Sequence, residues 1–116
     1  MTILDGSFDL TGTWLGDDGS TTYLRQVVLG DSIQIFWASV SALGAYPFSN
    51  IFTGYRVGDS IVGQWVDVPQ TNEDYIGSMS LVIADGNTIY QVANTLNYGT
   101  KIWIKVRSGF PPRCPD

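Results

Sequence analysis

The turn sequence Gly-Asp-Ser-Ile occurs at Gly30 and again at Gly58, and a related Gly-Asn-Thr-Ile follows at Gly86. The three copies recur every 28 residues. Glycine supplies the positive φ that a two-residue hairpin turn requires. Each copy lies between runs of β-branched and aromatic residues, so the pattern predicts three similar β-hairpins whose turns share one end of a sheet.

The rest of the chain continues this pattern. No segment keeps apolar residues at i, i+3, i+4 and i+7 for three turns, so no helix is expected. Eight strands are predicted, at residues 10–15, 21–29, 32–40, 48–57, 60–68, 75–84, 88–96 and 100–106. Every connection is short enough for a hairpin and too short for a crossover helix, so neighbouring strands are expected to be antiparallel.

We therefore predict an all-β domain over residues 1–107, an eight-stranded antiparallel up-and-down (meander) β-barrel, followed by a Pro-rich C-terminal tail at 108–116. A two-sheet sandwich is the alternative. The two-residue turns fix the register and divide the side chains between the two faces. The interior near the tight turns is then almost wholly aliphatic, which predicts a packed plug there of Val28, Ile33, Ile61, Ile83 and Ile89.

Toward the other end, the interior residues become aromatic and polar. We expect a small-ligand site in this mouth of the barrel, lined by Ser20, Gln26, Trp37, Asn50, Phe52, Trp65 and Asp67. The glycines Gly54 and Gly63 are expected to leave room for the ligand. In the alternative reading, the two tryptophans fill the barrel, whose eight strands enclose little more than their own side chains. Asp67 falls within a predicted strand, and under either alternative its charge needs a ligand donor, a loop N–H group or exposure to solvent near Pro69.

The composition argues against several classes of partner and of chemistry. The net charge is −5 and the sequence has no Lys/Arg cluster, so we expect no nucleic-acid partner. The chain has no His and one Cys, Cys114, which predicts no metal site, no cofactor, no internal disulfide and no imidazole-based catalysis. The N-terminus lacks the pattern of a signal peptide and no segment approaches the ~20 apolar residues of a membrane span. We expect a soluble protein, cytoplasmic or mature secreted, with no membrane partner.

Three short motifs resemble a known group of barrels. The stretch LTGTWLGDDGST at 10–21 resembles the first strand and loop of avidin-type biotin-binding barrels. FTGYRV with GDSIVGQW is similar to that family's middle hairpin, and ANTLNYGTKIWIKV to its last one. The Gly-x-Trp at Gly12 is also the start signature of lipocalins and fatty-acid-binding proteins. The resemblance implies a calycin barrel with a site at its open end and side-by-side association.

The resemblance does not extend to biotin. The family's loop Ser falls on Ser20, but its Asn falls on Gly16, and its last Asp falls near Gly99 or Thr100. The subunit-bridging Trp of that family has no clear counterpart. The motifs therefore imply the fold and an open-end site for another ligand.

Three functions follow. The first is non-catalytic binding of a small apolar or heterocyclic ligand. The second is a structural or self-associating module with a filled barrel, which would form a homo-oligomer through the outward residues Val27, Phe36, Val62 and Val66. A variant of this surface reading is carbohydrate binding by the aromatics Tyr23, Tyr46 and Tyr98. The third is an enzyme such as a barrel cyclase or isomerase, but the missing His and paired carboxylates lead us to expect no catalysis.

Overall fold

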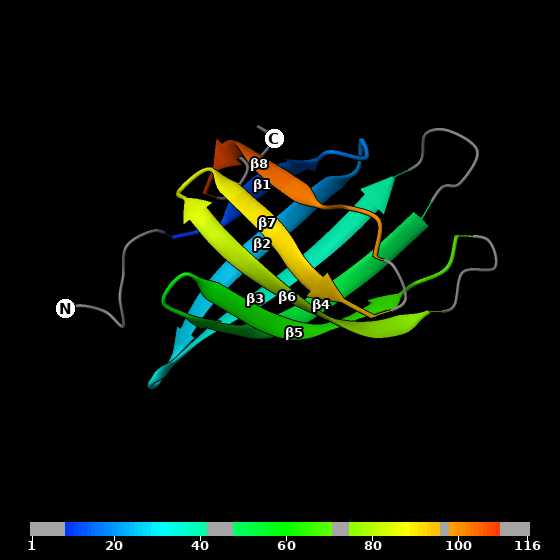
Figure 1. The fold of residues 1–116 in the computed structure, drawn as a ribbon. Coiled ribbons are helices and arrows are strands. Elements are labelled where there is room, and N and C mark those ends of the chain that lie inside the picture. Colours follow the sequence, from blue (N-terminus) through cyan, green and yellow to red (C-terminus); the bar gives the residue numbers. More distant parts are fainter. Residues whose placement is uncertain (1–8, 42–47, 71–74, 96–97, 110–116) are drawn as a thin grey trace, which may run out of the picture.

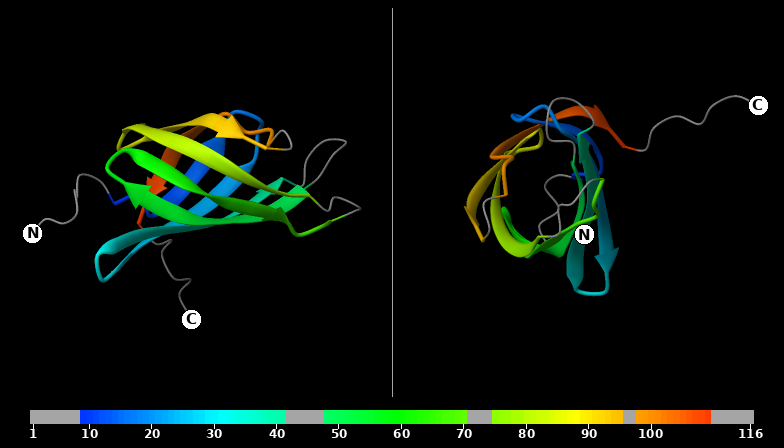
Figure 2. Two further views of the ribbon diagram at one scale, coloured as in Figure 1. Left: turned by 60° about the horizontal axis from the view of Figure 1, so that its bottom comes forward. Right: turned by 90° about the vertical axis from the view of Figure 1, so that its right-hand side faces the viewer.

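A computed structural model of the chain describes residues 9–41, 48–70, 75–95 and 98–109. These residues form a closed barrel in which consecutive strands pair antiparallel and the first strand pairs with the last (Figure 1). The strands are β1 (Gly12–Gly16), β2 (Thr21–Leu29), β3 (Ser32–Ser41), β4 (Phe48–Val57), β5 (Ser60–Asp67), β6 (Ile76–Asp85), β7 (Thr88–Asn94) and β8 (Ile102–Ser108). The predicted eight-stranded up-and-down barrel is confirmed, and Figure 2 shows its ring of strands in a view along the barrel.

The repeated turns fix the register as expected. Gly30 has a φ of 62° and Gly58 a φ of 59°, and the flanking pairs are Leu29 with Ser32 and Val57 with Ser60. The third turn joins β6 to β7 after a register shift near its end. All three turns lie at the left of Figure 1, and β1, β3, β5 and β7 each end at the opposite end of the barrel. We call these the tight end and the loop end.

The tight end is a packed plug, with one exception. Ile33, Ile61, Ile83 and Ile89 are all buried, as predicted. Val28 is 53% exposed, so its assignment to the plug is wrong. The reason is the short first strand: β1 pairs only with Thr21–Leu24 of β2, so the β2–β3 hairpin extends past the barrel wall.

A buried cation completes the plug. The Arg56 side chain is 3% exposed and donates from Nε to the Gly58 carbonyl at 2.9 Å. It also donates from Nη1 to Oε1 of Gln26 at 2.7 Å. Because a buried charge costs several kcal/mol without such partners, Gln26 has a structural role at this end.

Trp14 of β1 and Lys105 of β8 lie together where these two strands close the barrel. Trp14 of the Gly-x-Trp signature is fully buried and donates from Nε1 to the Leu10 carbonyl at 2.9 Å. Nζ of Lys105 lies 5.3 Å from the Trp14 ring centroid, and burial lowers the pKa of this lysine. Lys105 is half-buried, whereas Lys101, just before β8, is exposed.

The seam between β7 and β8 is the shortest ladder, with three register pairs. Beyond it, a backbone bond from the Gln91 N–H to the Lys101 carbonyl continues the pairing at 2.8 Å. Nε2 of Gln91 also donates to the carbonyls of Tyr98 and Thr100, and the Tyr98 N–H donates to Oδ1 of Asn94. Two side chains therefore reinforce the loop-end half of this seam.

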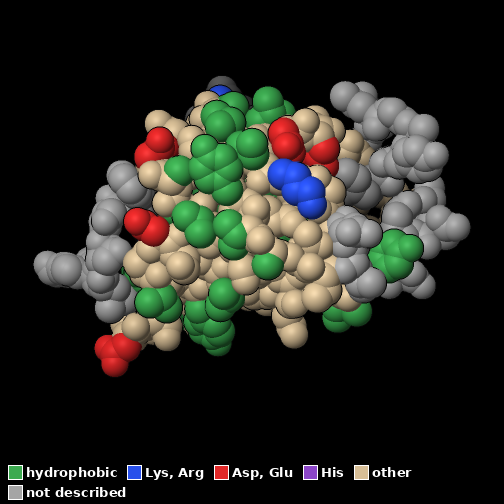
Figure 3. Space-filling view, viewed as in Figure 1, with side chains coloured by type: hydrophobic (Ala, Val, Ile, Leu, Met, Phe, Trp, Pro, Cys, Tyr) green, Lys and Arg blue, Asp and Glu red, His purple; other side chains and the backbone are tan. Residues whose placement is uncertain are grey.

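The outer surface is largely uncharged. On the face formed by β5 to β8, apolar side chains lie in several separate clusters (Figure 3). The described residues contain no helix long and apolar enough to cross a bilayer.

Candidate functional site

A row of polar side chains crosses the interior near the loop end. Thr22, Ser39, Asn50 and Asp67 are consecutive register partners on β2, β3, β4 and β5. We call them the polar row. Thr22 and Ser39 have no exposed surface and Asn50 is 5% exposed. The hydroxyls of Thr22 and Ser39 hydrogen-bond each other at 2.9 Å.

The next interior row toward the tight end is aromatic. Trp37, Phe52 and Trp65 are register partners on β3, β4 and β5, each 2–3% exposed. We call them the aromatic row. The rings of Trp37 and Phe52 stack with centroids 4.4 Å apart. The two rows together place polar groups directly over an aromatic floor.

Tyr98 links the two rows. Its hydroxyl donates to Oδ1 of Asn50 at 2.7 Å, and its ring meets that of Trp65 edge-on with centroids 4.9 Å apart. Burial raises the pKa of Tyr98 to about 12, against an opposing effect of the nearby Ser39, Trp37 and Asn50 groups. The phenol therefore stays protonated and keeps donating at neutral pH. Tyr98 is 4% exposed, so its proposed part in a carbohydrate-binding surface is wrong.

Trp103 of β8 completes the ring cluster. It is 1% exposed, and its ring centroid lies 5.2 Å from that of Trp37 and 6.3 Å from that of Tyr98. Five aromatic rings thus meet inside the loop-end half of the barrel.

Three indole N–H groups in this cluster lack a hydrogen-bond partner. Nε1 of Trp37, Trp65 and Trp103 is buried without one in the described part of the chain. Trp37 lies beside the Tyr98 hydroxyl, where it helps to lower that pKa without the geometry of a hydrogen bond. Nε1 of Trp65 lies next to Gly77, 2.9 Å from where a Cβ would be. Such buried donors are uncommon, and each one calls for an explanation, such as a water or another acceptor bound beside it.

The structure brings four of the seven predicted site residues together: Trp37, Asn50, Phe52 and Trp65. Asp67 lies in the polar row, half-buried, and its Oδ2 accepts from the Tyr75 N–H at 3.2 Å. The loop N–H group considered from sequence is therefore one of its partners.

The other two predicted residues lie elsewhere. Gln26 points toward the tight end and holds Arg56. Ser20 is fully buried, but its hydroxyl donates to Oδ1 of Asp18 at 2.6 Å, and the Thr100 hydroxyl donates to Oδ2 of the same carboxylate at 2.9 Å. Ser20 therefore belongs to a bonded cluster at the first loop.

The glycine pair does not leave the expected space. Gly54 and Gly63 face each other across β4 and β5, and the Phe52 ring lies over them. A Cβ at either position would lie 2.8–3.0 Å from this ring. The backbones and the phenyl ring occupy the volume that was predicted to be open, so the expectation of ligand space at these glycines is wrong.

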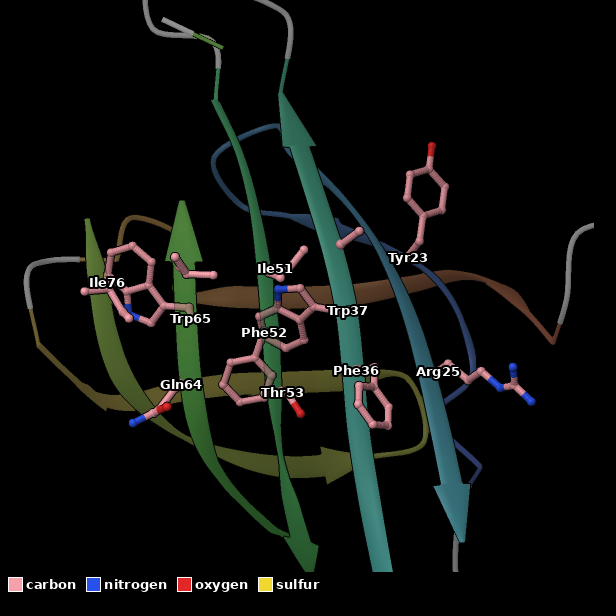
Figure 4. A pocket seen from close by; sticks show the side chains of 12 residues that line it. Tyr23, Arg25, Phe36, Trp37, Ile51, Phe52, Thr53, Gln64, Trp65 and Ile76 are labelled. Atoms are coloured by element: carbon pink, nitrogen blue, oxygen red, sulfur yellow. The ribbon is translucent and has the colours of Figure 1, made fainter. Parts of the chain in front are cut away.

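A groove of about 600 Å³ lies on the outer wall of β2 to β6 (Figure 4). Its outward lining is formed by Tyr23, Arg25, Phe36, Ala38, Ile51, Thr53, Gln64, Val66 and Ile76, with Trp37, Phe52 and Trp65 beneath. Of the outward residues expected to mediate association, Phe36 and Val66 line it.

The described residues contain no group of three or more acidic, His or Cys side chains placed to hold a metal ion. Cys114 and Tyr46, which were singled out from the sequence, lie outside the described residues. Comparison of the chain with protein-family models, curated proteins and solved structures found no match. The likeness to avidin-type and lipocalin barrels therefore stays a prediction from short motifs.

Proposed function

We propose that this barrel is a non-catalytic binding protein that holds a small apolar or heterocyclic ligand inside its loop end. The observation that carries the proposal is the polar row placed directly over the aromatic row. Ligand sites combine apolar walls with a few fixed polar groups in this way. A barrel that only filled its core would gain more from aliphatic side chains at Thr22, Ser39 and Asn50, because each buried polar group must find a partner.

The chemistry of these groups supports binding rather than catalysis. Hydroxyls, an amide and indoles are poor acids and bases near neutral pH, and a phenol with a pKa of about 12 is no exception. Biotin is not among the ligands we propose. The position of the family's Asn is Gly16, and a Cβ there would lie 2.6 Å from Oγ of Ser20.

Tryptophan fluorescence tests the proposal, because Trp37 and Trp65 form the floor of the site. Titration with a set of apolar and heterocyclic compounds should shift or quench the emission with at least one of them. The substitution Trp65→Ala should remove this response, whereas Gln64→Ala, which changes the adjacent outward residue, should retain it. A broad set without any response would contradict the proposal.

The outer groove supports a second candidate, self-association. Its lining includes the exposed side chains of Phe36, Ile51 and Ile76. The outward positions of β3, β4 and β5 carry no charged residue, and homodimer interfaces are depleted of charge in the same way. Light scattering should then report a dimer that Ile51→Glu dissociates and Val92→Glu, on β7, does not. A wild-type monomer at high concentration would contradict this candidate.

A further inference from the structure

We propose that the interior site takes a flat, uncharged ligand whose buried end carries a carbonyl-type oxygen, received by Nε1 of Trp37 and the amide NH₂ of Asn50. This inference rests on the proposed function and specifies its ligand class. It follows from which hydrogen-bond donors and acceptors at the site are already used.

The site has a surplus of donors. The Tyr98 hydroxyl hydrogen is committed to Oδ1 of Asn50, so Asn50 offers its NH₂ group to a further partner. The bond between the Thr22 and Ser39 hydroxyls uses one of their two hydrogens. Nε1 of Trp37 has no partner in the described part of the chain. An indole nitrogen can only donate, so its partner must be an acceptor.

Charge excludes ions from the buried end. The Asp18 carboxylate is bonded to the hydroxyls of Ser20 and Thr100, and Asp67 is bonded to the Tyr75 N–H at the rim. Arg56 is at the tight end, beyond the aromatic row. Because each of these charged groups is already hydrogen-bonded within the protein, an ion beside the rings of Trp37 and Trp103 would gain little to offset its desolvation.

The aromatic rings of the site indicate the shape of the ligand. Trp37 stacks on Phe52 and also contacts Trp103, while Trp65 contacts Tyr98. Walls of this kind favour a flat π-system, which stacks or meets them edge-on.

The experiment compares bicyclic probes of one size. Coumarin and chromone are flat, uncharged and carry a carbonyl; naphthalene has the shape without the acceptor; N-methylquinolinium adds a charge. Affinities come from calorimetry. The four indole signals in a ¹H–¹⁵N spectrum, assigned through Trp→Phe variants, report the N–H groups. Trp14 is the internal control, because its Nε1 already donates to Leu10.

Coumarin or chromone should bind about tenfold more tightly than naphthalene, and should move the Trp37 Hε1 signal downfield while leaving that of Trp14 in place. The substitution Trp37→Phe keeps a ring and should remove this preference. Asn50→Asp should do the same, because the carboxylate still accepts from Tyr98 but offers no donor. The unchanged Trp14 signal in each variant shows that the barrel is folded.

Equal or tighter binding of naphthalene, or of N-methylquinolinium, would overturn the ligand class while leaving the proposed function intact. Failure of every probe to bind, together with an unresponsive Trp fluorescence screen, would overturn both.

Discussion

The hydroxyl of Tyr98 donates a 2.7 Å hydrogen bond to Asn50, a residue 48 positions earlier in the chain. This bond ties the segment before β8 to the start of β4 across the interior. It fixes the amide of Asn50 with its oxygen occupied and its nitrogen available. The donor character of the candidate site depends on this one pair.

Removing this bond should destabilise the barrel. We expect Tyr98→Phe to lower the free energy of unfolding by about 1 kcal/mol or somewhat more, because Oδ1 of Asn50 loses its donor in a buried place. Urea denaturation measures the effect. Tyr23→Phe, on the exposed outer wall, is the matched control and should change stability little. Equal effects of the two substitutions would contradict the role of the bond.

The raised pKa of Tyr98 predicts a loss of stability at high pH. The phenol ionises near 10 in the unfolded chain and near 12 in the folded one, so its contribution is fully present below pH 10. It should fall by about 2 to 3 kcal/mol as the pH rises from 10 to 12. The difference between the wild-type and Tyr98→Phe stability curves isolates this residue. Parallel curves over that range would show that its pKa is not raised.

The glycine pair should tolerate no side chain. A Cβ at Gly63 would lie 2.2 Å from the Thr53 carbonyl oxygen and 2.8 Å from the Phe52 ring. We expect Gly63→Ala to cost about 1–3 kcal/mol through backbone displacement and overpacking. At Gly99 the nearest atom, Oδ2 of Asp18, is 3.9 Å away, so Gly99→Ala should be nearly neutral in thermal melts. A neutral Gly63→Ala would mean that β4 and β5 are less closely apposed.

Gln26 should contribute to the stability of the barrel and not to ligand affinity, because it bonds Arg56 at the tight end. Gln26→Leu removes a partner of the buried Arg56 and should lower stability by about 1–3 kcal/mol, while ligand affinity at the loop end stays unchanged. Gln34→Leu changes a half-buried amide of the neighbouring strand and should have a small effect on both. A selective loss of affinity in Gln26→Leu would return this residue to the ligand site.

The seam between β7 and β8 should open most readily. Gln91→Leu removes the donors to the Tyr98 and Thr100 carbonyls, and should speed amide hydrogen exchange in Ile102–Ser108 more than in Phe48–Val57. Gln64→Leu, on the outer wall, should leave both rates unchanged. Uniform acceleration in Gln91→Leu would indicate a global loss of stability instead.

The fold was predictable because its two-residue turns can be recognised in the sequence. A two-residue turn leaves one register, and alternation then assigns Trp37, Phe52, Trp65 and Asn50 to the interior. The same alternation could have found Ser39, two residues from Trp37, and then Thr22, which is its register partner. They were missed because small hydroxyl residues carry little weight in a hydrophobic pattern.

The remaining errors concern side-chain positions in three dimensions, which the alternation of residues along a strand does not encode. Tyr98 lies in a connection, where no alternation states which way a ring points. The exposure of Val28 depends on where β1 begins. The role of Gln26 depends on its position along the barrel axis, because its face of the sheet alone does not separate the tight end from the loop end. Phe52 covers the glycine pair because of its rotamer, which the strand pattern leaves free.

The pairing of Gly12 with Ser108 places the beginning of β1 beside the end of β8, at the tight end. A label or surface attachment placed next to Gly12 or Ser108 would therefore sit at the tight end, on the side of the barrel away from the polar row.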